Sequence, residues 1–228
     1  MSHFVVYAFS KNDGKDLEEL FAPYNENKEV EPYVFLTKEQ AIVEVRKEID
    51  EYRNGDTWQE WIADPEAYKK KAYENSRDEE YIIRHLDYLE NVFPKMLYWT
   101  DEECYENRAE WYIKDGLVDE NGNLLSTYNP KAKWDYYDTN GGWNGCLHTN
   151  DGELCNDGYV DEIDWEKTGR PFAFITPDGE WHERGKMGWW AIVTDEKEED
   201  SWEKEYRDTL KKLLEDGNIY VTVADCHI

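Results

Sequence analysis

Apolar and β-branched residues alternate with polar ones near both ends of the chain. This alternation predicts a first strand at residues 3–9 and three more at residues 171–175, 189–194 and 219–225. Residues 200–215 carry apolar side chains at helical spacing and predict a helix between the last two strands. The inward side of that helix is predicted to hold Trp202, Tyr206, Leu210 and either Leu213 or Leu214.

The middle of the chain has helical spacing with charged outer positions. Thr37 with Gln40, and Thr100 with Glu103, stand at the spacing of a capping box, so each pair predicts the start of a helix. The pattern is helical over residues 57–112, which we expect to form an insertion in an otherwise β-containing fold.

Glycine, asparagine, aspartate and aromatic residues dominate residues 116–166. This composition predicts a loop-rich region that is longer than a purely structural connection usually needs. The order of elements then favours a single α+β domain over residues 1–228, with a ferredoxin-like, mainly antiparallel sheet and the helical insertion at 57–112. We expect the first and last strands to be neighbours in the middle of that sheet.

The composition indicates a folded protein with an acidic surface. Eleven Trp and 17 Tyr in 228 residues argue against disorder, because disordered chains are poor in aromatic residues. The net charge of −27, from 53 acidic and 26 basic residues, argues against binding to duplex nucleic acid. The excess charge is explained either by solvation alone or by an acidic face for a basic partner, including imitation of DNA.

The sequence predicts a cytoplasmic location. No apolar run approaches the roughly 20 residues that span a bilayer. The first residues have neither the basic segment nor the cleavage site of a signal peptide. The four cysteines are widely spaced without a CxxC pair, so we expect free thiols. These are Cys104, Cys146, Cys155 and Cys226.

Several motifs resemble an uncharacterised family of proteins from bacteriophages and from bacteria that carry them. The motifs are MSHFVVYAF at 1–9, LFAPYNEN at 20–27, EVEPY at 29–33, YNPKAKWD at 128–135, ERGKMGWW at 183–190 and DCHI at 225–228. The resemblance implies a phage or prophage setting and no known activity. In the family an aromatic WDWY is followed by GGRW, whereas this chain has Gly142 in place of the arginine. If that arginine binds an anion in relatives, this protein has lost the contact or supplies the charge elsewhere.

The segment WDYYDTNGGWNG at 134–145 is the first candidate site. Its aromatic rings are suited to stacking on a planar base, and its glycines allow close approach of the backbone. Nearby cations, Arg170 among them, would neutralise phosphates, so we expect a nucleotide-like ligand. The predicted ligand-binding set is Lys131, Lys133, Trp134, Asp135, Tyr136, Tyr137, Trp143, Arg184 and Lys186. The alternative is a turn in which these rings pack on one another.

The chain ends provide a second candidate site. If the first and last strands pair, His3, Asp225 and His227 converge, with Cys226 on the opposite face of the sheet. Two imidazoles and a carboxylate suit a metal ion, and an imidazole can also act as a general base. The alternative is a structural role for histidines at strand ends. A third possibility is a nucleophilic cysteine, Cys146 or Cys155, activated by His148.

These features leave three classes of function open. The first is a non-enzymatic phage accessory protein that binds or sequesters a nucleotide-like host ligand to counter host defence. The second is an acidic interaction protein or DNA mimic that inhibits a basic host protein. The third is a metal-dependent enzyme that uses the chain-end histidines. We expect no cofactor, and phosphate-binding glycine motifs are missing from the sequence.

Overall fold

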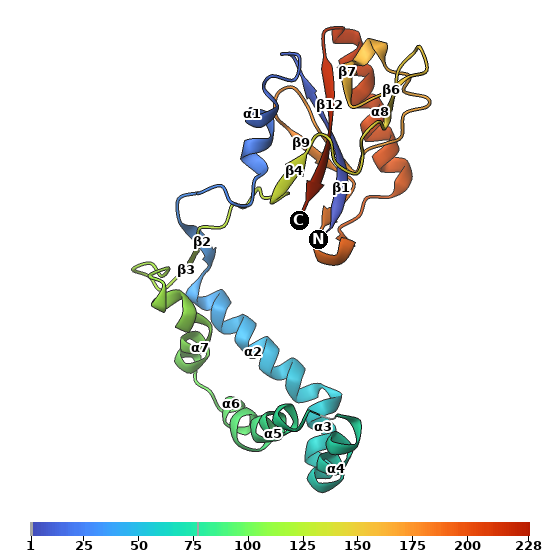
Figure 1. Ribbon diagram of the computed structural model, residues 1–228. Helices are drawn as coiled ribbons and strands as arrows, with labels where there is room; N and C mark the ends of the chain where they lie inside the picture. The colour runs from blue at the N-terminus through green and yellow to red at the C-terminus, as the bar shows by residue number, and fades with distance from the viewer. Residues whose placement is uncertain (1, 77) are drawn as a thin grey trace. The chain divides into compact units, whose positions relative to one another are not determined.

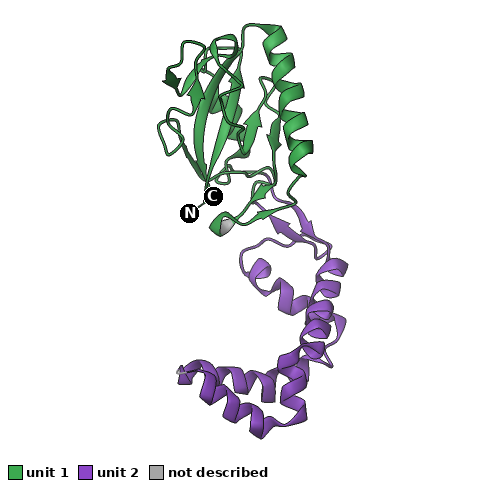
Figure 2. Cartoon of the chain, turned by 90° about the vertical axis from the view of Figure 1, so that its right-hand side faces the viewer, with its two compact units in different colours: residues 1–30, 128–228 green, residues 31–127 purple. Residues whose placement is uncertain are grey.

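The computed structural model describes residues 2–76 and 78–228, and the chain divides into two compact units (Figure 2). One unit combines Met1–Val30 with Tyr128–Ile228, and the other is Glu31–Thr127. Each unit has its own hydrophobic core. The helical unit is longer than the insertion predicted at residues 57–112, because the preceding helix packs its buried Val45 and Ile49 into the same helical core.

The first unit contains a mixed, mainly antiparallel sheet with the order β4-β12-β1-β8-β9, and β7 also pairs with β12. Its two long strands, β1 (His3–Ser10) and β12 (Tyr220–His227), run antiparallel side by side (Figure 1). The prediction that the first and last strands pair in the middle of the sheet is therefore confirmed. The remaining strands are β4 (Tyr136–Asp138), β7 (Asp157–Tyr159), β8 (Ala173–Ile175) and β9 (Trp181–Glu183).

The ferredoxin-like arrangement is not confirmed. In a split βαβ unit, another strand separates the two parallel strands. Here β1 and β8 are parallel and directly hydrogen-bonded, with Tyr7 opposite Phe174. The strand predicted at residues 189–194 is also wrong. Trp190 and Ala191 have φ values of 64° and 57°, which interrupt an extended backbone, so only β11 (Val193–Thr194) forms and pairs with β10 (Lys186–Met187).

Helix α8 (Glu199–Asp216) and helix α1 (Leu17–Phe21) contribute to the cores on opposite faces of the sheet. Side chains alternate between the two faces of a strand, so Val5, Tyr7 and Phe9 of β1 join the α8 side, while Phe4 and Val6 join the α1 side. On α8 the buried residues are Trp202, Tyr206, Leu210 and Leu213, which resolves the alternative left open between Leu213 and Leu214.

The predicted loop-rich region contributes several short elements. Within this region, β4 and β7 join the main sheet, and two small separate sheets also contain strands from it. These are β2 (Tyr33–Leu36) with β3 (Leu124–Ser126), and β5 (Leu147–His148) with β6 (Leu154–Cys155). Single turns of 3-10 helix occur at Ala22–Tyr24, Val160–Glu162 and Trp189–Ala191.

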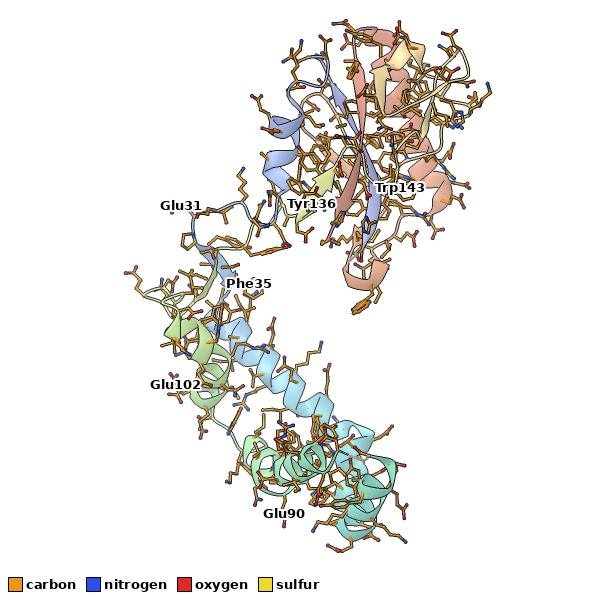
Figure 3. All side chains as sticks on the ribbon, viewed as in Figure 1. Glu31, Phe35, Glu90, Glu102, Tyr136 and Trp143 are labelled. Carbon is orange, nitrogen blue, oxygen red and sulfur yellow. The ribbon has the colours of Figure 1, made fainter. Side chains whose placement is uncertain are left out.

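The second unit is mainly helical. Its helices are α2 (Lys38–Asn54), α3 (Asp56–Ala63), α4 (Pro65–Asn75), α5 (Glu79–Asp87), a π-helical turn (Tyr88–Val92), α6 (Phe93–Met96) and α7 (Asp101–Lys114). Trp58, Trp61, Leu89 and Phe93 lie in its core. Acidic side chains such as Glu90 and Glu102 are exposed (Figure 3). Among the described helices, none is long and apolar enough to cross a membrane.

Both predicted capping boxes are confirmed. The Thr37 side chain accepts a hydrogen bond from the Gln40 backbone, and the Thr100 side chain accepts one from the Glu103 backbone. In each case the residue three positions on returns a side-chain contact to the backbone of the threonine. These bonds satisfy N–H groups that a helix start otherwise leaves unpaired.

Removal of the Thr100 cap is expected to destabilise the helical unit. Thr100→Ala should lower its free energy of unfolding by about 1 kcal/mol, because the Glu103 backbone N–H loses its acceptor. Urea unfolding followed by circular dichroism at 222 nm would measure this change. Thr194→Ala, at an exposed position in β11, is the control and should change stability far less. Equal effects of the two substitutions would contradict the capping role.

Candidate metal centre at the chain ends

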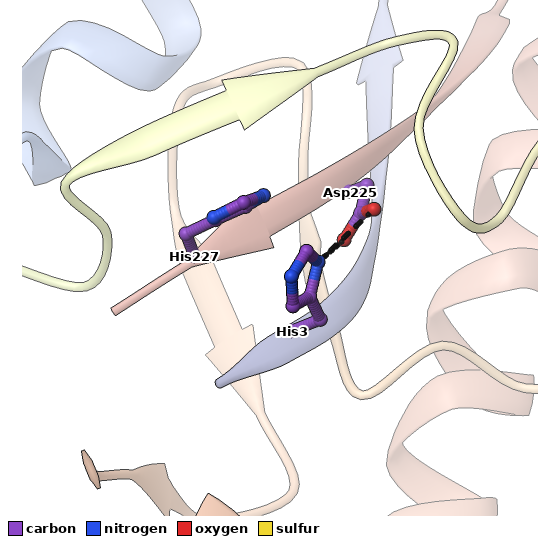
Figure 4. Close-up of side chains that lie close together, drawn as sticks. All are labelled: His3, Asp225 and His227. Carbon is purple, nitrogen blue, oxygen red and sulfur yellow. Dashed lines mark hydrogen bonds and ion pairs between the residues drawn. The ribbon is translucent and has the colours of Figure 1, made fainter. Parts of the chain in front are cut away.

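The pairing of β1 with β12 brings His3, Asp225 and His227 together. His3 lies directly opposite His227 in the antiparallel register, and Val5 lies opposite Asp225. Residues two apart on a strand share a face, so Asp225 and His227 both project on the side of His3 (Figure 4). One ligand atom from each of the three side chains lies within 4.8 Å of the others. The predicted convergence of these residues is therefore present.

The three side chains contact one another closely. Nδ1 of His3 lies 3.1 Å from Oδ1 and 3.3 Å from Oδ2 of Asp225. The rings of His3 and His227 are 3.9 Å apart between centroids and tilted by 52°. The ring of Tyr136, across the β4–β12 pair, meets His227 edge-on at 5.2 Å. His3 is half exposed, which leaves the cluster open to solvent on one side.

The glycines of the WDYYDTNGGWNG segment close over the Asp225 carboxylate. The Gly142 backbone N–H donates a hydrogen bond of 2.7 Å to Oδ2 of Asp225. A Cβ atom on Gly141 would lie 2.5 Å from both Cβ and Oδ2 of Asp225, so no larger residue fits there without displacement. The glycine loop of the first predicted site therefore packs on the carboxylate of the second. The paired glycines signalled a close backbone approach, and the structure shows that the approach is to Asp225.

Asp225 carries a buried negative charge with little to balance it. Asp225 is only 3% exposed to solvent. In the described part of the chain, the one ion pair that Asp225 forms is with His3. Burial and the Asp225 carboxylate raise the pKa of the Cys226 thiol on the other face of the sheet. An isolated buried carboxylate is costly unless a cation or several hydrogen bonds compensate it, so this site favours a positive ligand.

The structure divides the aromatic rings predicted to stack on a ligand. Trp134 is 6% exposed and packs in the core against Phe21 and Tyr137. Tyr137 also stacks on Phe21 at 4.5 Å. These two rings therefore support the α1 side of the sheet and are not open for stacking on a ligand. Tyr136 and Trp143 are exposed at 57% and 40% and remain accessible (Figure 3).

The other residues of the predicted ligand-binding set are also dispersed. Asp135 donates its backbone N–H to the His227 carbonyl, and its Oδ1 is buried without a hydrogen-bond partner in the described part of the chain. Lys131 is exposed. Lys133 pairs with Glu183 at 2.5 Å, and Lys186 pairs with Asp195 at 2.6 Å. Both lysines line a cavity of about 220 Å³, and Ile228 forms another part of its wall.

A larger cavity, of about 380 Å³, adjoins the chain-end cluster because His3 lines it. Trp143 and Arg184 of the predicted set also line it, together with Arg170. Arg170 forms ion pairs with Glu199 and Glu203, and Arg184 forms one with Glu196. The cavity therefore combines one exposed indole, two guanidinium groups and one imidazole of the cluster.

The cysteines do not form an activated nucleophile. Burial raises the pKa of both the Cys146 and the Cys155 thiols, which keeps them protonated near neutral pH. Cys146 instead lies 3.7 Å from the Tyr7 hydroxyl at the edge of the α8-side core. All four cysteines are free thiols, as predicted.

No protein-family model matches the chain, and no curated protein and no solved structure matches it significantly.

Proposed function

We propose that this protein binds a divalent transition-metal ion through His3, Asp225 and His227. The observation that supports this most directly is the convergence of two imidazoles on a buried carboxylate that has no Lys or Arg partner among the described residues. A bound ion would compensate the charge of Asp225, for which the described residues offer His3 but no Lys or Arg.

The donor set indicates the kind of ion. Imidazole and carboxylate ligands suit zinc and its neighbours among the transition metals. Ligand atoms about 2.0–2.2 Å from zinc stand roughly 3.0–3.5 Å apart. The 3.1 Å between His3 Nδ1 and Asp225 Oδ1 is already at this spacing. All three ligand atoms lie within 4.8 Å of one another, so a modest further approach would bring the whole set to this spacing.

A neighbouring backbone group orients the Asp225 carboxylate by a hydrogen bond. Groups that hydrogen-bond to metal ligands orient them and are needed for full affinity. The Gly142 N–H holds Oδ2 of Asp225 and leaves Oδ1 directed at His3. Three protein ligands leave at least one coordination position for water or a small ligand, as in zinc sites that bind substrates.

We also propose a cytoplasmic setting for the protein, in a host cell that carries a phage or prophage. Four free thiols fit a reducing compartment. The phage setting rests on the resemblance of the sequence motifs, and a role against host defence rests on that setting. Expression of the chain in bacteria challenged with phages, compared with its Asp225→Asn variant, tests whether the site matters for such a role.

One zinc ion per chain is expected to bind, and its affinity should depend on the cluster. Asp225→Asn and His227→Ala should each weaken zinc binding by about tenfold or more, because the first removes the charge of the carboxylate ligand and the second removes an imidazole ligand. Isothermal titration calorimetry measures the affinity, and elemental analysis after dialysis measures the stoichiometry. His85→Ala in the helical unit is the control and should leave zinc binding unchanged. A purely structural His3–Asp225 pair would leave His227→Ala indistinguishable from the unmodified protein.

Gly141→Ala is expected to disturb both stability and zinc binding. The added Cβ would meet Asp225 at 2.5 Å, and such overpacking typically costs about 1–3 kcal/mol. Gly169→Ala is the matched control, since a Cβ there meets no atom within 4 Å. Thermal unfolding with and without zinc would compare them. If the two variants behaved alike, the close packing of the loop on Asp225 would be refuted.

A further inference from the structure

The cavity next to the chain-end cluster is lined for a ligand that carries both a ring and an anion. It lies where β1 begins and α8 starts, with His3 at its boundary with the cluster. Apolar side chains form much of the wall, and two arginines add charge. The lining residues from the apolar part are Phe4, Val5, Pro171, Phe172, Met187 and Trp202.

The two guanidinium groups provide the means to bind an anion. Glu199 and Glu203 hold Arg170, and Glu196 holds Arg184. A guanidinium has five N–H donors in a fixed plane, so these ion pairs orient each arginine and leave further donors for a ligand. Arginine binds phosphate and carboxylate groups through two parallel hydrogen bonds.

Glu199 also lines the cavity and opposes an incoming anion. Its pairing with Arg170 at 2.9 Å reduces that repulsion. A divalent ion held by His3, Asp225 and His227 would add a net positive charge beside the same cavity. Anion binding should therefore be stronger when the ion is present, because a bound cation is the largest local charge in such a site.

Trp143 provides the surface for a ring. It is 40% exposed, it lines the cavity, and it follows directly after the two glycines that close over Asp225. Stacking of a base on an aromatic side chain contributes about 1–3 kcal/mol. The loop therefore connects the ring of Trp143 directly to the backbone that contacts Asp225. A displacement of the loop would move both.

The volume limits the size of the ligand. Small-molecule sites range from about 300 to 1,000 Å³, and this cavity, at about 380 Å³, is near the lower limit. A mononucleotide-sized molecule suits it better than a dinucleotide.

We infer that this cavity takes a mononucleotide-like ligand, a planar ring bearing one phosphate. The phosphate lies between Arg170, Arg184 and the metal ion, and the ring stacks on Trp143. The part of this inference that involves the ion rests on the proposed metal site. The contacts of the ligand with the arginines and with the indole of Trp143 do not depend on the metal site.

The test uses the full chain and adenosine 5′-monophosphate as the probe, with adenosine and inorganic phosphate as its two parts. Calorimetric titrations would be run on zinc-loaded protein, freed of excess zinc, and on metal-free protein. We expect the nucleotide to bind the zinc-loaded protein about tenfold more tightly than the metal-free protein, and more tightly than either part alone.

Three variants locate the ligand. Arg184→Gln and Trp143→Ala should each weaken nucleotide binding by about tenfold, through loss of phosphate and ring contacts respectively. Lys186→Gln is the control with the same change of charge, and it lies on the other cavity. It should leave binding unchanged. Arg170→Gln replaces Arg184→Gln if the latter does not fold.

The outcomes separate the two proposals. Zinc binding without nucleotide binding overturns the inference and leaves the metal site standing. Nucleotide binding that Arg184→Gln weakens, in a protein that binds no zinc, overturns the metal site and the contribution of the ion. Equal affinity for adenosine and its monophosphate overturns the role of the arginines, and equal losses in Arg184→Gln and Lys186→Gln overturn the choice of cavity.

Discussion

The antiparallel pairing of β1 with β12 is the interaction on which the rest of the sheet-containing unit depends. It joins the two ends of the chain over eight residue pairs, from His3 opposite His227 to Ser10 opposite Tyr220. The pair provides the central strands of the sheet, and its side chains enter both cores. A shift of one residue would move every side chain to the opposite face. The same register that buries Val5 and Val223 therefore places both histidines beside Asp225.

Burial of Asp225 constrains the neighbouring loop. A carboxylate that is 3% exposed requires donors or a cation close by, and the loop supplies one donor from Gly142. The backbone reaches Asp225 only because Gly141 has no side chain. Trp143 follows immediately and is carried to the adjoining cavity. One loop thus orients a metal ligand and presents an exposed ring, which joins the proposed ion site to the proposed ligand cavity through covalent structure.

Local patterns in the sequence predicted several elements well. Capping boxes at Thr37 and Thr100 depend on residues three positions apart, so they can be recognised without knowledge of the fold. Strand alternation likewise indicated that Asp225 and His227 share a face and that Cys226 lies on the other. The strand predicted at residues 189–194 was wrong, since the left-handed conformations of Trp190 and Ala191 do not follow from their residue types.

Local patterns in the sequence are sufficient to predict the strands at the chain ends, the helix starts, the glycine-rich loop and the residue types available for metal binding. Which aromatic rings are buried depends on the tertiary structure. Trp134 lies in the core, whereas Trp143 remains exposed. The tertiary structure also placed Arg170 and Arg184 on one cavity and Lys133 and Lys186 on another, and it packed the glycine loop on Asp225. The physical reason is that these outcomes depend on contacts between residues far apart in the chain. Such contacts follow from strand register and packing, whereas local periodicity reports only which face of its own element a residue occupies.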